Sequence, residues 1–109
     1  MPRCRAELAL RTIVANSSDS GYSLEAAADV VGLSRWYVSR ILVRETGYGF
    51  GGHMRRLRMM RAVLLMERPE LSVKEIAARA GFSSTSEMDR KFRGQFRTTP
   101  SEFRRAAIE

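Results

Sequence analysis

The stretch SLEAAADVVGLS, residues 23 to 34, returns later in the chain as SVKEIAARAGFS, residues 72 to 83. The two copies share serine, alanine and glycine at matching positions: Ser23 with Ser72, Ala28 with Ala77 and Gly32 with Gly81. Self-similarity of this kind is typical of one structural unit used twice. The repeat therefore sets the expected plan of the chain of 109 residues.

Each copy predicts a short helix followed by a turn. Apolar residues recur at helical spacing in both copies: Leu24, Ala27, Ala28 and Val31 in the first, and Val73, Ile76, Ala77 and Ala80 in the second. The alanines allow close helix crossing, and Gly32 and Gly81 stand where a helix ends in a left-handed residue. A second helix after each glycine completes a helix-turn-helix unit.

The second helix of the first unit begins within LSRWYVSRIL, residues 33 to 42, and has two different sides. Tyr37, Val38, Ile41 and Leu42 gather on the side that we expect to face a core. The opposite side carries Arg35, Trp36, Ser39, Arg40 and Val43. A solvated face needs no exposed tryptophan beside an arginine, so this side predicts a binding surface. The alternative is a partly buried Trp36 among solvated arginines.

The second helix of the second unit gives a weaker pattern. Met88, Phe92 and Phe96 form its expected buried side, and its outward side carries Ser86, Asp89, Arg90 and Arg93, with Thr85 near the helix start. Asp89 repels phosphate, and a solvated polar face remains the alternative here. Three capping boxes predict helix starts in this half: Ser72 with Glu75, Ser84 with Glu87, and Thr99 with Glu102, the last with Pro100 at the first helical position.

The remaining segments also read as helices. Residues 5 to 15 place Leu10, Ile13 and Val14 on one face, and residues 50 to 66 predict a longer connecting helix. The expected apolar stripe of this helix is Phe50, Met54, Leu57, Met60 or Arg61, and Leu64. We expect an all-α fold of about seven helices without a sheet. Its parts are residues 1–49 with the first unit, 50–68 with the connecting helix and 69–109 with the second unit.

The charge balance points to a polyanionic partner. Nineteen lysines and arginines against 12 acidic residues give a formal charge of +7, and only Lys74 and Lys91 are lysines. Nucleic acid is the first expected partner, before an anionic membrane or an acidic protein. The arginine bias suits bidentate contacts with phosphates or guanine, although a GC-rich genome alone produces the same bias.

Other classes of protein have little support. Cys4 and His53 are the only residues of their kinds, so we expect no disulfide, metal site or cofactor. No paired carboxylates, Ser/His/Asp set or phosphate loop suggests an enzyme. The longest apolar run, AVLLM at residues 62 to 66, is far too short to span a membrane, and no signal peptide precedes it. We expect a cytoplasmic protein without a membrane segment.

In a helix-turn-helix unit the outward face of the second helix enters the major groove of DNA, where arginine bonds guanine and an aromatic ring packs on thymine. This context favours DNA contact for Trp36, Ser39 and Arg40. Arginines 55, 56, 58 and 61 on the connecting helix either pair with acids such as Glu67 or lie along phosphates. Helix starts near Ser34, Ser84 and Thr99 are candidate phosphate sites.

These patterns resemble the DNA-binding domain of the AraC/XylS family of bacterial transcription regulators. The most specific matches are the GF pair at residues 81 and 82, RKF at 90 to 92, and the P-x-x-F-R pattern from Pro100 to Arg104. The resemblance covers the chain from about Ala6 to Ala106. Arg97 departs from the family by standing where glycine is common, and His53 by standing where an aromatic is common.

The resemblance implies two helix-turn-helix units that read two adjacent segments of one promoter. It implies base-facing positions for Trp36, Ser39, Arg40, Thr85, Ser86 and Arg90. Arg35 and Arg93 complete the DNA-binding set that we predict. Family members often activate transcription by also touching RNA polymerase, but no residue can be assigned to that contact. We expect a monomer on double-stranded DNA, either a small regulator of the MarA and SoxS type or the DNA-binding part of a larger protein.

Two rival functions stay open. A basic RNA-binding or nucleoid-type protein would use the same charge without reading bases, and a helical adaptor would use the same helices to bind proteins. The target sequence, any inducer and the sign of regulation do not follow from the sequence.

Overall fold

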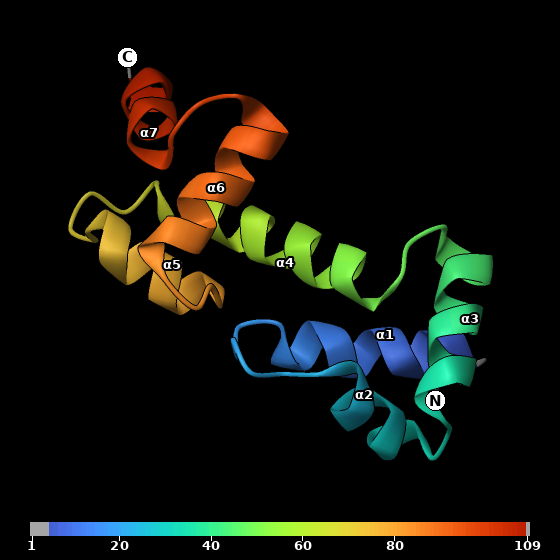
Figure 1. The fold of residues 1–109 in the computed structure, drawn as a ribbon. Helices are drawn as coiled ribbons and strands as arrows, with labels where there is room; N and C mark the ends of the chain where they lie inside the picture. Colours follow the sequence, from blue (N-terminus) through green and yellow to red (C-terminus); the bar gives the residue numbers. More distant parts are fainter. Residues whose placement is uncertain (1–4, 109) are drawn as a thin grey trace. The chain divides into compact units, whose positions relative to one another are not determined.

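The computed structural model describes residues 5 to 108, which form seven helices and no strand (Figure 1). In chain order the helices are α1 (Arg5–Asn16), α2 (Leu24–Val31), α3 (Arg35–Thr46), α4 (Phe50–Leu65), α5 (Val73–Ala80), α6 (Thr85–Phe96) and α7 (Pro100–Ile108). The predicted all-α class with seven helices is confirmed. No helix between residues 5 and 108 is long and apolar enough to cross a membrane.

The chain divides into two compact units within α4. The first unit ends at Leu57 and the second begins at Arg58. Each unit contains one copy of the repeat, with α2 and α3 in the first and α5 and α6 in the second. The repeated glycines end their helices as predicted, since Gly32 and Gly81 have positive φ angles of 71° and 103°.

The core of the first unit lies where α1, α2, α3 and the start of α4 meet (Figure 1). Its buried members are Ala9, Ile13, Ala27, Ala28, Val38, Leu42 and Met54. The small side chains at Ala27 and Ala28 let α2 pack closely against its neighbours. Val14 was expected on the buried face of α1, but its side chain is 49% exposed. That prediction was wrong because the core reaches only as far as Ile13 and the partly buried Leu10.

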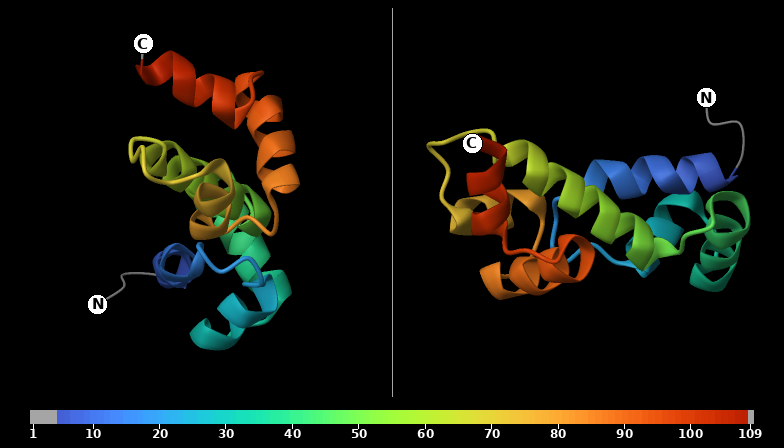
Figure 2. Two further views of the ribbon diagram at one scale, coloured as in Figure 1. Left: turned by 90° about the vertical axis from the view of Figure 1, so that its left-hand side faces the viewer. Right: turned by 90° about the horizontal axis from the view of Figure 1, so that it is seen from above.

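The core of the second unit contains more sulfur and aromatic side chains. Its buried members are Met59, Ala62, Met66, Leu71, Ile76, Ala77, Ala80, Phe82, Met88 and Phe92. The ring of Phe92 meets Phe103 of α7 edge-on at 5.2 Å between centroids and Phe96 at 4.9 Å. This cluster holds α7 against α6, although the chain changes direction sharply between them (Figure 2). Phe96 was predicted to be buried, but it lies at the rim of the cluster and is 40% exposed.

The predicted apolar stripe of α4 is correct in its first half and wrong in its second. Met54 is buried, with Phe50 and Leu57 packed beside it. In the second half, however, Met60 and Leu64 are 60% and 59% exposed. Met59, Ala62 and Met66 are buried instead, because this half of the helix packs into a different core with its own set of facing side chains.

Side-chain caps begin five of the helices. The hydroxyls of Ser23 and Ser34 accept bonds from the helix amides three residues on, at 3.1 and 3.2 Å. Ser72 with Glu75 and Thr99 with Glu102 form the reciprocal boxes that were predicted. At Ser84 the box is altered: its hydroxyl caps Glu87 N, but the Glu87 carboxylate accepts from Ser83 N at 2.8 Å. The turn before α6 presents the Ser83 amide to this carboxylate, in place of the Ser84 amide.

Arg104 joins α7 to the end of α4 within the second unit. Its guanidinium donates to the carbonyl oxygens of Met66 at 3.2 Å, Leu71 at 2.7 Å and Arg68 at 2.6 Å. All three carbonyls belong to the turn that follows α4, where the regular helix bonds have ended. One side chain therefore satisfies three backbone acceptors that lie more than 30 residues away in sequence.

Candidate nucleic-acid interface

The outward face of α3 carries an exposed tryptophan between polar groups. Trp36 is 71% exposed and Arg40 is also exposed, whereas Ser39 is half-buried. Val38, Ile41 and Leu42 lie on the opposite side and are buried. A large exposed indole costs free energy in water unless a partner covers it. This face of α3 is therefore the strongest candidate for a binding surface in the first unit.

Tyr37 was expected on the core side of α3, but it is 38% exposed. Its hydroxyl accepts a hydrogen bond from Arg5 Nη1 at 3.2 Å, and the Arg5 guanidinium lies 5.5 Å from its ring. The prediction failed because Tyr37 stands at the edge of the buried face, where α1 contributes an arginine to its surroundings.

Arg35 lies at the start of α3 and already has partners within the protein. Its Nη1 atom is 2.7 Å from Oε1 of Glu25 on α2, and its guanidinium carbon lies 4.8 Å from the Trp36 ring. The Arg35 hydrogen bond is the largest cause that holds the pKa of Glu25 below 4.5. Sequence reasoning missed Glu25, since nothing in the repeat singles it out. The available signal was an acidic residue in the helix that precedes an arginine-rich face, which could have indicated a partner for Arg35.

The outward face of α6 is more polar and its charges are partly paired. Arg90 and Ser86 are exposed, and Thr85 is half-buried at the helix start. Arg93 reaches Asp89 at 4.0 Å with 63% of its side chain exposed. All four predicted residues of this unit lie in α6, but Asp89 places a negative charge among them. Unlike the face of α3, this face has a serine, Ser86, at the place of the exposed indole.

The arginines of α4 differ in their surroundings. Arg55 and Arg56 are exposed, and the Arg56 guanidinium lies 4.3 Å from the Tyr48 ring. Arg58 is buried at 9% exposure, which a cation in contact with phosphate would not be in the free protein. Of the four arginines considered for the connecting helix, Arg55 and Arg56 therefore fit a phosphate contact best. Tyr48 was not identified from the sequence.

The junction between α3 and α4 is held by one threonine hydroxyl. Thr46 Oγ1 donates to Leu42 O at 2.6 Å and lies 2.8 Å from His53 Nε2. The ring of His53 meets Tyr48 edge-on, with 5.9 Å between centroids. Burial, followed by the nearby Arg56 cation, lowers the pKa of His53 below 6.5. His53 therefore favours the neutral form here, and it fills the place where an aromatic was expected.

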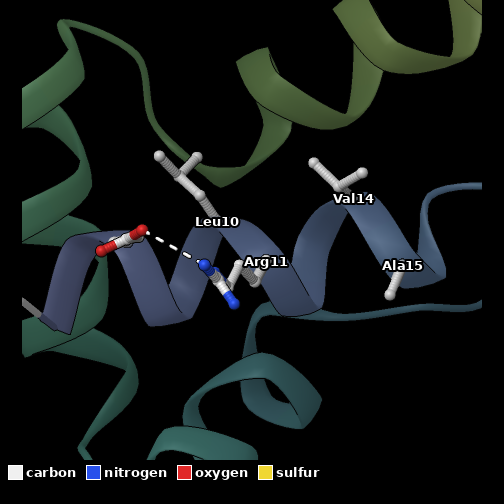
Figure 3. Close-up of a pocket in the computed structure, with 5 residues that line it drawn as sticks. Leu10, Arg11, Val14 and Ala15 are labelled. Carbon is white, nitrogen blue, oxygen red and sulfur yellow. Dashed lines mark hydrogen bonds and ion pairs between the residues drawn. The ribbon is translucent and has the colours of Figure 1, made fainter. Parts of the chain in front are cut away.

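A shallow apolar surface on α1 lies apart from the predicted residues. Leu10, Val14 and Ala15 line it, with the ion pair of Arg11 and Glu7 at its edge at 3.4 Å (Figure 3). The polar side chains that line it, Glu7 and Arg11, pair with each other. Within residues 5 to 108 no three metal-binding side chains are grouped, and Cys4 lies outside the described residues.

Comparison with protein families gives one match that covers most of the chain. A family described as a helix-turn-helix domain matches residues 27–106. The probable transcription factor PqrA of Proteus vulgaris is 31% identical over 86 residues, which are 79% of this chain and 70% of PqrA. The regulatory protein PocR of Salmonella typhimurium is 37% identical over 101 residues, which are 93% of this chain but 33% of PocR. The chain thus spans most of one relative and a third of the other.

Solved structures with the same fold come from regulatory proteins. The C-terminal domain of AraT, a response regulator from Geobacillus stearothermophilus, has a TM-score of 0.90 and 28% identity over 96% of this chain and 87% of that one. A regulator from Chromobacterium violaceum, described as AraC-type, has a TM-score of 0.79 and 28% identity over 92% and 88%. The DNA-binding domain of AdpA, solved with a target DNA, has a TM-score of 0.82 and 26% identity over 90% and 87%.

Proposed function

Because this chain belongs to the AraC family of helix-turn-helix transcription regulators, we propose that it binds double-stranded DNA and reads bases with α3 and α6. The observation that carries the proposal is the face of α3, where Trp36 is 71% exposed in the second helix of a helix-turn-helix unit. The relative AdpA, whose structure includes a target DNA, supports the same partner.

The first unit is proposed as the stronger reader. Arg40 is exposed, and its guanidinium is proposed to donate to O6 and N7 of a guanine in the major groove. The Ser39 hydroxyl is proposed to donate to or accept from a neighbouring base edge. The Trp36 indole is proposed to pack on a thymine methyl or a sugar, which would cover apolar surface that is exposed in the free protein. Arg35 is proposed to approach the DNA beside Trp36, with its guanidinium held by Glu25.

The second unit is proposed as the weaker reader. Arg90 is its proposed base contact, with Thr85 and Ser86 near the start of α6, where polar side chains and amides meet the DNA backbone. Arg93 is proposed to contact phosphate, in competition with Asp89 at 4.0 Å. Competition of this kind lowers the gain from the Arg93 phosphate contact. The second unit also has Ser86 at the place of the exposed Trp36 indole, so it is proposed to contribute less affinity than the first.

The two readers are proposed to contact adjacent major-groove segments as parts of one monomer. We further propose the cytoplasm as its location and RNA polymerase as a second partner.

Selection of bound sequences from a random duplex library tests this function, followed by titration of the selected duplex, random duplex and structured RNA. We expect the selected duplex to bind at least about 1,000-fold more tightly than random duplex. If about six phosphates are neutralised, the plot of log K against log salt has a slope near −5.

Equal affinity for all three nucleic acids would support the rival basic protein that does not read bases. No measurable DNA affinity at low salt would support the protein-binding adaptor. PqrA is described as a probable transcription factor and PocR as a regulatory protein, and we propose no enzymatic activity.

A further inference from the structure

We propose that Glu25 on α2 sets the specificity of the first unit, by holding Arg35 over Trp36 and away from DNA phosphates. The inference rests on the proposed function, since it assigns a positioning residue to the proposed reading face of α3. Glu25 is not part of that face itself, and it acts through Arg35.

The Arg35 guanidinium contacts two other groups, the Glu25 carboxylate and the Trp36 ring. Oε1 of Glu25 lies 2.7 Å from Nη1 of Arg35, and the guanidinium carbon of Arg35 lies 4.8 Å from the Trp36 ring. A guanidinium can bond a carboxylate at its edge and lie against an aromatic ring with its flat face. Arg35 thus makes both contacts at once, and the carboxylate restricts where the cation lies relative to the indole.

The helices around these groups are fixed by the first core. Glu25 is in the first turn of α2, and Arg35 is the first residue of α3 after the Ser34 cap. Ala27 and Ala28 of α2 and Val38 of α3 are buried in the same cluster. The two backbones therefore hold the carboxylate and the guanidinium close together, which lowers the entropy cost of pairing them.

The second unit lacks this arrangement. By the alignment of the repeat, Lys74 stands at the place of Glu25 and Thr85 at the place of Arg35. A negative charge beside a DNA-reading face weakens phosphate attraction, and the second copy has a positive charge there. The acid at position 25 thus opposes affinity. We infer that Glu25 compensates for this loss of affinity by positioning Arg35.

The physical effect is a reduction of sequence-independent binding. A free arginine at the start of α3 would bind any phosphate, and phosphate contacts carry no sequence information. Pairing with Glu25 competes with that contact and keeps the indole covered on one side. Specificity is a difference between two affinities, so a residue that weakens non-specific binding more than specific binding increases it. Both side chains are about half exposed, so pairing with Glu25 increases the fraction of molecules in which Arg35 lies over Trp36 but does not fix Arg35 there.

The test compares Glu25→Gln with the wild type on the selected duplex and on random duplex. Freeing one arginine for one phosphate raises the affinity for random duplex about fivefold to tenfold near 0.1 M salt and makes the salt slope steeper by about 1. The selected duplex gains less, so the ratio of the two affinities falls. Glu70→Gln is the matched control, because Glu70 pairs with Arg68 at 3.0 Å with similar exposure outside the reading faces. We expect this control to leave the ratio unchanged.

A double-mutant cycle shows whether Glu25 acts through Arg35. In an Arg35→Ala background, Glu25→Gln should leave the ratio of affinities unchanged. An equal gain for both duplexes in both backgrounds would mean that Glu25 only repels phosphate, which overturns the inference. Trp36 is the single tryptophan of the chain, so acrylamide quenching of its fluorescence reports this contact without DNA. We expect stronger quenching in Glu25→Gln, and unchanged quenching contradicts the inference.

Failure of the inference is distinguishable from failure of the proposed function. A wild type that does not prefer its selected duplex contradicts the proposed function, and the inference is lost with it. A wild type that does prefer its selected duplex, with a ratio that Glu25→Gln leaves unchanged, overturns the inference alone.

Discussion

The two helix-turn-helix units share one plan, but their second helices carry different surfaces. At the place of Trp36 in α3, α6 has Ser86, and at the place of Ser39 it has Asp89. The first unit exposes an indole, whereas the second unit pairs Asp89 with Arg93. A repeated scaffold therefore keeps its buried positions and varies its outward ones. The difference predicts that the two units contribute unequally to binding and to stability.

The largest expected effect concerns Arg104, which has three carbonyl partners in the second unit. Arg104→Ala leaves the carbonyls of Met66 and Leu71 with water or no partner, whereas Arg68 O keeps its bond from Leu71 N, and the variant should lower the free energy of unfolding by about 3 kcal/mol. Urea unfolding followed by circular dichroism measures this loss. Arg105 on the same helix is exposed, and Arg105→Ala should cost no more than about 0.5 kcal/mol. Equal losses for the two variants would remove the special role of Arg104.

The second effect compares the proposed readers directly. Arg40→Ala should weaken binding to the selected duplex by about 2 kcal/mol and binding to random duplex much less, because a guanine contact is lost. Arg90→Ala should show the same pattern at about 1 kcal/mol, since Asp89 lies on the same face of α6. Fluorescence anisotropy titrations on both duplexes give the four values. If Arg40→Ala weakens both duplexes alike, Arg40 contacts phosphate and not a base.

The third effect concerns the residue that ends each second helix. Gly47 after α3 and Arg97 after α6 occupy matching places and are both left-handed, with φ angles of 82° and 58°. A side chain costs about 1 kcal/mol in this conformation, so Gly47→Ala should destabilise the protein by about that amount. Nothing lies within 4 Å of a Cβ built on Gly47, so this cost is conformational.

The reciprocal variant Arg97→Gly should stabilise the protein by about 0.5 kcal/mol, because relief of the left-handed side chain exceeds the extra entropy of glycine in the unfolded chain. Urea midpoints of the two variants give the comparison. A loss of stability in Arg97→Gly would show that the Arg97 side chain makes a stabilising contact.

The smallest effect is a difference in pH dependence. The pKa of His53 in the first unit is lowered below 6.5 by burial first and then by Arg56. As the pH falls through 6.5, His53 therefore binds a proton more readily in the unfolded chain than in the folded one, and the first unit loses stability. In the second unit the hydrogen bond from the Ser72 backbone amide holds the pKa of Glu75 below 4.5. The stability that this hydrogen bond gives to the second unit is therefore lost only when the pH falls below that value.

Residue-resolved thermal unfolding, followed by amide NMR at about pH 7 and about pH 5, separates the two units. We expect the first unit to lose more stability than the second over this interval. His53→Gln should abolish the difference, because glutamine does not titrate and can still bond Thr46. A difference that persists in this variant would have another origin.

Most of the fold was predictable because its signals are local. Ser23, Ser34 and Ser72 cap helices through amides three residues away, and Gly32 and Gly81 end helices by their own backbone freedom. The interactions that escaped prediction join distant residues. Arg35 meets Glu25 ten positions away, and Arg104 meets carbonyls 33 to 38 positions away. Helical periodicity contains no information about such pairs.

The side chains that were predicted to be buried but are exposed also depend on packing between distant elements. Tyr37, Phe96 and Val14 each lie at the edge of an apolar stripe, where the neighbouring element decides burial. Met60 and Leu64 continue a stripe that the second core does not use. A helical wheel gives the direction of a side chain but not the extent of the partner that covers it.

The sequence by itself determined the seven helices, the repeat, the charge and the side of α3 that carries Trp36, because caps, glycines and spacing act within a few residues along the chain. Only the tertiary structure decided which cations already have partners, as Arg35 and Arg104 do, and which apolar residues stay exposed. Those outcomes depend on distances between groups that the chain brings together only when its helices pack.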